Sequence, residues 1–419
     1  MKLKILTISE FFPPNIKGGA EISTKLLVDE LSKKNECIVV TSKFGKPYKE
    51  NYLVYPLLKR CDYEGSLLKK IYYGINLFFS PIYNYFKIKK IIKEKNPDVI
   101  HIIPTHFTYF RLISFLSKMG KPIVIDIRDY SFNSAFGSDK EGSPISFTKR
   151  AMSKRLFISK FLFLVIGMYE SIIFKSYIKN LKKMDKEKEC IKFIALSNFI
   201  RDRLIQAGFS KDKIKIIPNI SKKSIVKNRK RKNKIIFAGR IEKDKGVWDL
   251  IKAVEILQNK KIYLDLVGNG SESENIKNYL TDKKIRNIRL LGKVSNKEVL
   301  KKYAESKIIL GPSTWPEPFG RFIQESITTK TPCIATKVGG IPEGIKDHET
   351  GLLVEPNNPK QLAEAIQELL TNKKLYNKIV KNLKKEVNKY SPEAIGNQRL
   401  ALFEKILKEQ NNGGSEIFK

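Results

Sequence analysis

Short apolar runs alternate with amphipathic stretches of helical length along most of the chain. The first cycle consists of residues 4–9, 20–34 and 37–42, and nearly continuous apolar runs continue at 99–104, 123–127 and 192–197. Such runs are typical of strands that are buried on both faces of a parallel sheet. The alternation therefore predicts a parallel sheet with helices on both faces.

The same rhythm restarts after a polar, highly basic stretch at residues 221–233, SKKSIVKNRKRKN, which we interpret as a linker. With 419 residues and 42% hydrophobic content, the chain is long enough for two cores. The prediction is α/β: two doubly wound, Rossmann-like domains whose ligands lie at the carboxyl ends of the strands, in a cleft between them. The predicted boundaries are 1–220 for the N-terminal domain, 221–233 for the linker, 234–395 for the C-terminal domain and 396–410 for a terminal helix that packs back on the first domain.

Two segments interrupt the rhythm of the first domain. Residues 57–95 are rich in Tyr, Phe and Lys, and residues 147–183 contain an apolar core at 157–174 with Lys and Arg on both sides. The core includes charged residues, which disfavours a transmembrane span and favours a helix lying in the headgroup plane. A pair of helices packed on their own domain explains the pattern equally well.

Charge and cysteine content narrow the possible partners and compartment. Eighty Lys and Arg against 43 Asp and Glu give a net charge of +37, which attracts nucleic acid or an anionic bilayer, although a general preference for Lys explains part of the excess. The four cysteines form no CxxC pair, and the N-terminus enters a strand pattern without a signal peptide. We therefore expect a cytoplasmic protein.

The segment 311–351 has the most informative combination of residues, GPSTWPEPFGRFIQESITTKTPCIATKVGGIPEGIKDHETG. Seven residues separate Glu317 from Glu325, Phe319 and Gly320 follow the first Glu closely, and a Gly-Gly pair comes later. This order resembles glycosyltransferase family 4, of the GT-B fold, whose C-terminal domain carries a Glu, seven residues, Glu motif followed by a Gly-Gly loop.

The resemblance implies a role for both carboxylates. In family members the first Glu binds the donor sugar and the second hydrogen-bonds the ribose hydroxyls, so Glu317 is a catalytic and donor-binding candidate and Glu325 a donor-binding one. Phe319 and Gly320 join them, because Pro318 and Gly320 suit a loop that enters a helix, where free N–H groups bind phosphate. Taken alone, the spacing also fits two solvated surface carboxylates.

A second match to the family covers residues 237–246, FAGRIEKDKG. It implies that Arg240 and Lys245 clamp the diphosphate. Fixed cations stabilise the negative charge that develops on the leaving group, so the protein needs no metal ion. We predict no cofactor and no metal, with a nucleotide diphosphate sugar as substrate.

Two weaker matches complete the predicted donor site. Gly268 lies in VGNG after an apolar run, where it would let the backbone approach the nucleotide, although a plain tight turn has the same pattern. Val294 ends the sequence LGKV, which matches the strand end that contacts the base in family members. No residue selects a particular base.

The N-terminal domain supplies candidates for both substrates. Residues 11–21, FFPPNIKGGAE, resemble the family's first loop, which implies that Gly18 and Gly19 approach the donor and acceptor; a flexible turn is the alternative. The family often has His-x-His after the fourth strand, and here the sequence is HIIPTHF, in which His101 fits and His106 lies three residues beyond the second expected position.

The sequence IRDY at residues 127–130 departs from the family in a similar way. Many relatives have His-Asp-Tyr there, and in this chain Arg128 replaces the histidine while Asp129 is retained. We take His106 and Asp129 as catalytic candidates on the acceptor side, because a loop His orients or deprotonates an acceptor hydroxyl. His106 is equally well explained as an ordinary loop residue.

Together, the resemblance implies a retaining, metal-independent hexosyltransferase that acts on a membrane-associated acceptor, either lipid-linked or a polysaccharide, from the inner face of the cell membrane. A sugar-nucleotide epimerase or phosphorylase on the same fold is the first alternative. A basic nucleic-acid-binding protein is the second, but no nucleic-acid motif is present and the cations are spread over every helix. We therefore expect a nucleotide sugar, a glycan or lipid-linked acceptor and an anionic membrane as partners, and no nucleic acid.

Overall fold

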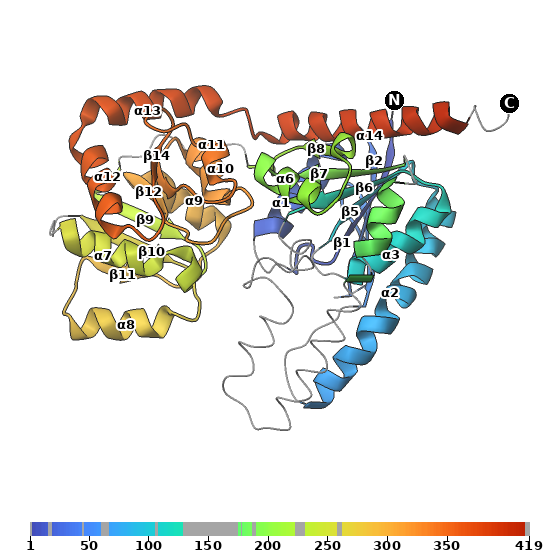
Figure 1. The fold of residues 1–419 in the computed structure, drawn as a ribbon, viewed down its shortest axis with the longest axis horizontal. Helices are drawn as coiled ribbons and strands as arrows, with labels where there is room; N and C mark the ends of the chain where they lie inside the picture. Colours follow the sequence, from blue (N-terminus) through green and yellow to red (C-terminus); the bar gives the residue numbers. More distant parts are fainter. Residues whose placement is uncertain are drawn as a thin grey trace. The chain divides into compact units, whose positions relative to one another are not determined.

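The computed structural model describes two α/β units (Figure 1). Unit 1 comprises Met1–Ile217 and Ile395–Lys419, and unit 2 comprises Pro218–Ala394. The described residues are 2–15, 19–43, 46–59, 67–104, 108–128, 175–176, 178–186, 190–222, 231–257 and 262–414.

Unit 1 is built on an eight-stranded sheet with the order β3-β4-β2-β1-β5-β6-β7-β8. All neighbouring strands are parallel except the β3–β4 pair, which is antiparallel. The strands are β1 (Lys4–Ser9), β2 (Glu36–Ser42), β3 (Tyr48–Lys49), β4 (Leu53–Leu58), β5 (Val99–Ile103), β6 (Ile123–Ile127), β7 (Ile191–Ala195) and β8 (Ile214–Ile216).

The helices of unit 1 cover its sheet and include the C-terminal helix of the chain. Ser197 caps α6 by accepting a hydrogen bond from the Ile200 N–H at 3.2 Å, which satisfies one of the free donors at a helix start. The described helices are α1 (Gly19–Leu31), α2 (Leu67–Lys95), α3 (Thr108–Leu116), η1 (Ser117–Met119), α6 (Asn198–Gln206), η2 (Lys211–Lys213) and α14 (Pro392–Gly414).

Unit 2 is built on a six-stranded, wholly parallel sheet with the order β11-β10-β9-β12-β13-β14. Its strands are β9 (Lys234–Ala238), β10 (Tyr263–Val267), β11 (Ile288–Leu290), β12 (Ile308–Gly311), β13 (Cys333–Thr336) and β14 (Leu352–Val354). Its helices are η3 (Lys243–Lys245), α7 (Val247–Leu257), α8 (Ser273–Asp282), α9 (Asn296–Glu305), α10 (Arg321–Thr329), α11 (Ile341–Gly344), α12 (Pro359–Thr371) and α13 (Lys373–Glu386).

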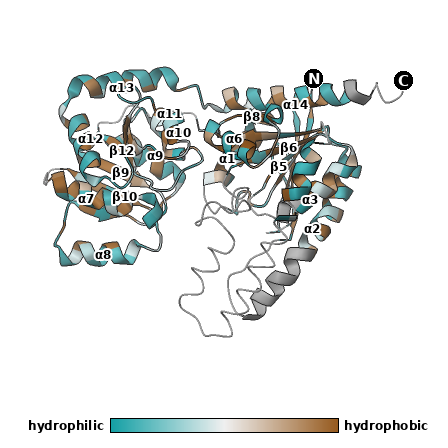
Figure 2. Cartoon of the chain, in the orientation of Figure 1, coloured by the Kyte–Doolittle hydropathy of each residue, from teal (hydrophilic) through white to brown (hydrophobic). Residues whose placement is uncertain are grey.

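The strands supply the cores of both units. Every residue of β5, β6, β12 and β13 is buried, and Figure 2 shows the hydrophobic strands of unit 2 beneath helices with hydrophilic outer faces. Helix α13 illustrates the pattern: Leu375, Ile379 and Leu383 are buried at a spacing of four residues, which defines one face of a helix. None of the helices in the described ranges is both long and apolar enough to cross a bilayer.

The predicted fold class is confirmed, since both units are doubly wound parallel sheets. The predicted strands at 4–9, 123–127 and 234–238 have the observed bounds. The segment 57–95, which we read as an interruption, contains one long helix, α2, and the strands β3 and β4 before it extend the sheet. The segment 157–174 lies outside the described residues.

Candidate active site

The strand order of unit 2 fixes where a ligand binds. The chain builds outward from β9 through β10 to β11, and then restarts on the other side of β9 with β12. Ligands of doubly wound sheets bind at the carboxyl ends of the strands where the order reverses. The loops after β9 and β12 are therefore the candidate site, and the predicted Arg240, Lys245 and Glu317 all lie in them.

The two loops approach each other at Gly246, between η3 and α7. Its φ is +67°, and a Cβ placed on it would lie 1.8 Å from the carbonyl oxygen of Pro312, directly after β12. The carbonyl of Asp244 accepts hydrogen bonds from the N–H groups of Thr314 and Trp315 at 3.0 and 3.1 Å. Only glycine fits at Gly246, and the backbone contacts hold the two loops as one structure.

Lys245 and Glu317 form an ion pair at this junction. Lys245 Nζ lies 2.5 Å from Glu317 Oε1, and the two side chains are 16% and 21% exposed, so a ligand can reach them. Arg240 is 64% exposed and lies 3.5 Å from the carboxylate of Asp244. The structure thus brings Lys245 and Glu317 together, and leaves Arg240 at the surface of the same loop.

Helix α10 begins immediately after Glu317. The N-cap residue of this helix is Gly320, with a φ of +83°. Phe319 is buried, and its ring lies 5.7 Å from that of Tyr390. These residues set the start of the helix, and the start of a helix is suited to a phosphate. Phe319 therefore packs against Tyr390 within unit 2.

Glu325 lies one turn into α10 and is only 8% exposed. Its Oε1 accepts from Arg321 Nε at 2.9 Å and from Asn296 Nδ2 at 3.2 Å. Asn296 begins α9, so two helices orient this carboxylate. Neither Arg321 nor Asn296 was predicted as a site residue, although the spacing of four residues between Arg321 and Glu325 is that of a helical ion pair.

Two further glycines permit close approaches at the same end of the sheet. A Cβ on Gly268 would lie 1.8 Å from the carbonyl oxygen of Gly239, and one on Gly339 would lie 2.4 Å from that of Glu317. The Gly340 N–H donates to the same Glu317 oxygen at 2.8 Å. The predicted Gly268 thus permits a close contact between the loops after β9 and β10. The predicted Val294 lies half-buried after β11.

The corresponding reversal in unit 1 lies between β1 and β5. Ser9 ends β1 and donates from its hydroxyl to the carbonyl of Phe11 at 2.9 Å, which turns the chain away from the sheet. Gly19 begins α1. Three predicted candidates, Gly18, His106 and Asp129, lie outside the described residues.

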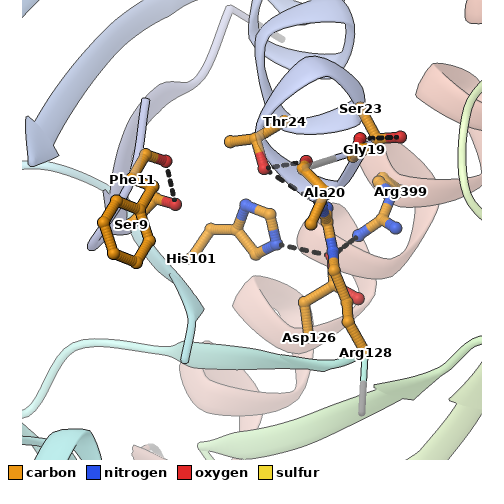
Figure 3. Close-up of polar contacts among 10 residues, drawn as sticks. All are labelled: Ser9, Phe11, Gly19, Ala20, Ser23, Thr24, His101, Asp126, Arg128 and Arg399. Carbon is orange, nitrogen blue, oxygen red and sulfur yellow. Dashed lines mark hydrogen bonds and ion pairs between the residues drawn. The ribbon is translucent and has the colours of Figure 1, made fainter. Parts of the chain in front are cut away.

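A buried polar cluster lies beside this region (Figure 3). Asp126, in β6, accepts from Arg128 Nη2 at 2.9 Å and from Arg399 Nη1, in α14, at 2.8 Å. His101 Nε2 lies 3.6 Å from the same oxygen, Oδ2, and its ring packs 5.6 Å from that of Phe403. His101 is fully buried, so the residue that fits the family pattern belongs to the core.

Arg128 connects this cluster to the start of α1. Its Nη1 donates to the carbonyl of Ala20 and to Thr24 Oγ1, both at 3.0 Å. The side chain is 7% exposed. Arg128 therefore occupies the position of the family's histidine, but its donors are directed at Asp126 and α1.

The charges in the cluster determine its protonation. Burial alone would raise the pKa of Asp126, but the guanidinium groups of Arg128 and Arg399 outweigh it and hold the pKa well below its usual range. Burial lowers the pKa of His101 more than the nearby carboxylate raises it. At neutral pH the cluster therefore contains a carboxylate, two guanidinium groups and a neutral imidazole.

Within the described ranges, no group of three or more His, Cys, Asp or Glu side chains is placed to bind a metal ion. The positive groups of the unit 2 site are instead Arg240 and Lys245, together with the start of α10. This arrangement can bind a phosphorylated ligand through cations and backbone N–H groups and place a carboxylate, Glu317, beside it.

Comparisons with known proteins show the family of the chain. The family Glycosyl transferases group 1 matches residues 218–386. An uncharacterized glycosyltransferase of Methanocaldococcus jannaschii is 30% identical over 307 residues, covering 70% of this chain and 81% of that protein. The capsular polysaccharide biosynthesis glycosyltransferase CapM of Staphylococcus aureus is 26% identical over 344 residues, covering 76% of this chain and 88% of that protein.

A solved structure has the same fold. The solved structure of HepE from Anabaena, in complex with UDP and glucose, superposes with a TM-score of 0.64 over 95% of this chain and 98% of that one, at 18% identity. Two doubly wound units in one chain form the GT-B fold. The chain belongs to the group 1 glycosyl transferases.

Proposed function

We propose that this enzyme is a retaining hexosyltransferase of family 4, in which Glu317 and Glu325 are the paired carboxylates of the Glu, seven residues, Glu motif. The observation that carries the proposal is the Lys245–Glu317 pair at the reversal point of unit 2. A carboxylate at this position can accept hydrogen bonds from sugar hydroxyls, and the lysine beside it can contact a phosphate.

The donor in this proposal is a nucleoside diphosphate sugar. Lys245, Arg240 and the start of α10 bind the diphosphate, and Glu325 accepts from the ribose hydroxyls. Glu325 is held by Arg321 and Asn296, so the ribose meets a carboxylate whose direction is already fixed. HepE binds UDP, which makes uridine diphosphate sugars the first donors to test.

The proposed transfer retains the configuration of the anomeric carbon. The bond between that carbon and the diphosphate oxygen breaks, and the electron pair leaves with the diphosphate. The acceptor oxygen bonds to the same face of the sugar, and its proton passes to the departing diphosphate. Lys245 and Arg240 stabilise the charge that grows on the leaving group, so the proposed mechanism uses no metal ion.

The acceptor in this proposal is a growing polysaccharide or a lipid-linked sugar at the inner face of the cell membrane. Two observations support it: CapM acts in capsular polysaccharide biosynthesis, and the chain carries a net charge of +37, which favours an anionic surface. We propose His106 and Asp129 for the acceptor side and Phe319 and Val294 for packing around the nucleotide.

The test of this function combines donor binding, stereochemistry and metal dependence. A thermal-shift screen of nucleotide sugars identifies the donor, because a ligand that binds only the native state raises its melting temperature. Proton NMR of the product then gives the anomeric configuration, with full activity expected in excess chelator. An inverted product would refute retention, and loss of activity that manganese or magnesium restores would refute metal independence.

The same assay separates transfer from the alternatives. A transferase releases nucleoside diphosphate only when an acceptor is present, whereas an epimerase converts the donor alone. Conversion of the donor sugar without acceptor would favour the epimerase.

A further inference from the structure

The outer face of α2 carries three exposed aromatic side chains. Phe79, Tyr83 and Phe86 are 57%, 45% and 63% exposed, and their spacing of four and three residues places them on one side of the helix. The other large hydrophobic side chains exposed among the described residues, Ile256 and Tyr263, lie in unit 2. Single exposed aromatics are ordinary, but a cluster on one face indicates an interaction surface.

The opposite face of α2 is firmly attached to unit 1. Ile88, Ile91 and Ile92 are buried in its core, and the Asn84 side chain bridges the backbone of Lys59, accepting from its N–H at 2.8 Å and donating to its carbonyl at 3.1 Å. The ring of Tyr85 lies 5.2 Å from that of Phe115 in α3. The helix therefore presents its outer face on a rigid support.

Lysines continue the same face after the aromatics. Lys87, Lys90 and Lys93 are exposed, and Lys90 is 77% exposed beside Glu94 at 3.8 Å. Lys87 Nζ lies 5.7 Å from the ring centre of Tyr83, where the two groups meet. At about 1.5 Å per residue, the aromatic turns and the lysine turns occupy successive halves of a stripe roughly 20 Å long.

We propose that this face of α2 binds the surface of an anionic lipid bilayer. Phe79, Tyr83 and Phe86 enter the boundary between headgroups and acyl chains, and the three lysines contact the phosphates above them. A bilayer interface has an apolar boundary below anionic phosphates, which matches a helix face that carries both exposed aromatics and lysines.

The geometry of the helix suits this role. Figure 1 shows the first turns of α2 extending past the ends of α3 and the strands. The surface is separate from the donor residues of unit 2. Membrane binding itself does not depend on the proposed function. Only its role, which is to bring the enzyme to its acceptor, rests on that function.

The test is sedimentation of the full-length protein with vesicles of phosphatidylcholine alone or with added phosphatidylglycerol. The wild type is expected to bind the anionic vesicles and to be released by high salt. Tyr83→Ser with Phe86→Ser should weaken binding about tenfold or more, because two inserted rings are lost. The matched control is Ile256→Ser with Tyr263→Ser, which removes two exposed hydrophobic side chains elsewhere and should bind as the wild type does.

The lysines have a matched control in α13. Replacement of Lys87, Lys90 and Lys93 by Gln should weaken binding to anionic vesicles, while replacement of the exposed Lys374, Lys378 and Lys385 by Gln removes the same charge and should have a smaller effect. Equal losses in both triple variants would overturn the proposal, since net charge alone would then explain binding. Equal binding of the wild type to neutral and anionic vesicles would also overturn it.

Two further outcomes separate this inference from others. If a single-stranded oligonucleotide displaces the vesicles and its own binding is lost in the Tyr83, Phe86 variant, the face belongs to nucleic acid and the proposal is wrong. Nucleotide binding, measured by thermal shift with UDP, should be unchanged in that variant. Vesicle binding by a wild-type protein that binds none of the nucleoside diphosphates would refute the donor proposal and leave this one intact.

Discussion

Arg399 of α14 and Asp126 of β6 form a fully buried ion pair, although 273 residues separate them in the chain. The pair joins the C-terminal helix to the central sheet of unit 1. Because Arg128 binds the same carboxylate and the start of α1, one aspartate connects three elements that come from distant parts of the sequence.

We expect Arg399→Met to destabilise unit 1 by about 3 kcal/mol, because removing one partner of a buried pair leaves part of a buried charge uncompensated. The two tryptophans, Trp248 and Trp315, both lie in unit 2. In this variant, circular dichroism should therefore show a loss of structure at a lower urea concentration than in the wild type. The urea midpoint measured by tryptophan fluorescence should be unchanged.

The control for this change is Lys405→Met, at a side chain of the same helix that is 68% exposed. It should alter stability by less than about 0.5 kcal/mol. A fluorescence midpoint that falls together with the circular dichroism in the Arg399 variant would mean that the two units unfold as one.

His101 should make unit 1 less stable in acid. Burial lowers its pKa in the folded protein, whereas the unfolded chain has the ordinary value of about 6.5. As the pH falls below about 6.5, the unfolded state binds a proton that the folded state does not, so the free energy of unfolding decreases until the folded pKa is reached. Stability measured between about pH 7.5 and pH 5.5 should show this loss, and His101→Gln should reduce it.

His348→Gln provides the comparison for this pH dependence. Its side chain is 54% exposed and lies 3.2 Å from Asp347, away from any core. The change of stability with pH in this variant gives the contribution of an exposed histidine, against which the effect of the His101 replacement is compared. An unchanged slope in the His101 variant would show that the imidazole does not control acid stability.

Gly246→Ala should disrupt the donor site more than the same change at Gly292. The two glycines have φ values of +67° and +66°, so both variants incur the same cost of a left-handed conformation, about 1–2 kcal/mol. At Gly246 the new methyl group also meets the Pro312 carbonyl, while at Gly292 the first neighbour is Asn269 Oδ1 at 3.8 Å. Unfolding of unit 2 followed through tryptophan fluorescence should therefore show a further loss of at least about 2 kcal/mol in the Gly246 variant. Equal losses in the two variants would mean that the loops can separate freely.

Glu325→Ala should weaken nucleotide binding by about 1.5–3 kcal/mol, the usual worth of a hydrogen bond to a charged group. Isothermal titration with a nucleoside diphosphate measures this directly. Glu364→Ala, at an exposed carboxylate of α12, removes the same charge from another part of unit 2 and should leave affinity unchanged. Nucleotide affinity that survives in the Glu325 variant would contradict its assignment to the ribose.

The sequence predicted the sheets well because buried parallel strands leave a strong local signal. Runs such as those of β1, β6 and β9 are apolar on both faces and need no knowledge of their neighbours. Helix α2 was harder to predict from the sequence, because Pro81 lies inside it and helix interiors usually exclude proline. Packing of Ile88, Ile91 and Ile92 against the core maintains the helix, and that is tertiary information.

Some residues of the candidate site could likewise be predicted from the sequence, and others could not. The candidates Lys245 and Glu317 were found because each lies in a recognisable stretch of sequence, and the fold brings them together. Asn296 was missed because its contact with Glu325 joins two helices. Arg128 was identified as a departure from the family, but nothing local indicates that Asp126 and the start of α1 take its hydrogen bonds.

The contribution of α14 to unit 1 has a consequence for protein synthesis. Ile395, Arg399, Phe403 and Ile406 are buried in a unit whose other elements all precede Pro218. At about 5–20 residues per second, translation of unit 2 keeps the new N-terminal unit waiting on the order of ten seconds or more for these side chains. During that interval Asp126 lacks one guanidinium and His101 lacks the ring beside it. Most of unit 1 therefore leaves the ribosome before unit 2, but unit 1 is completed after it.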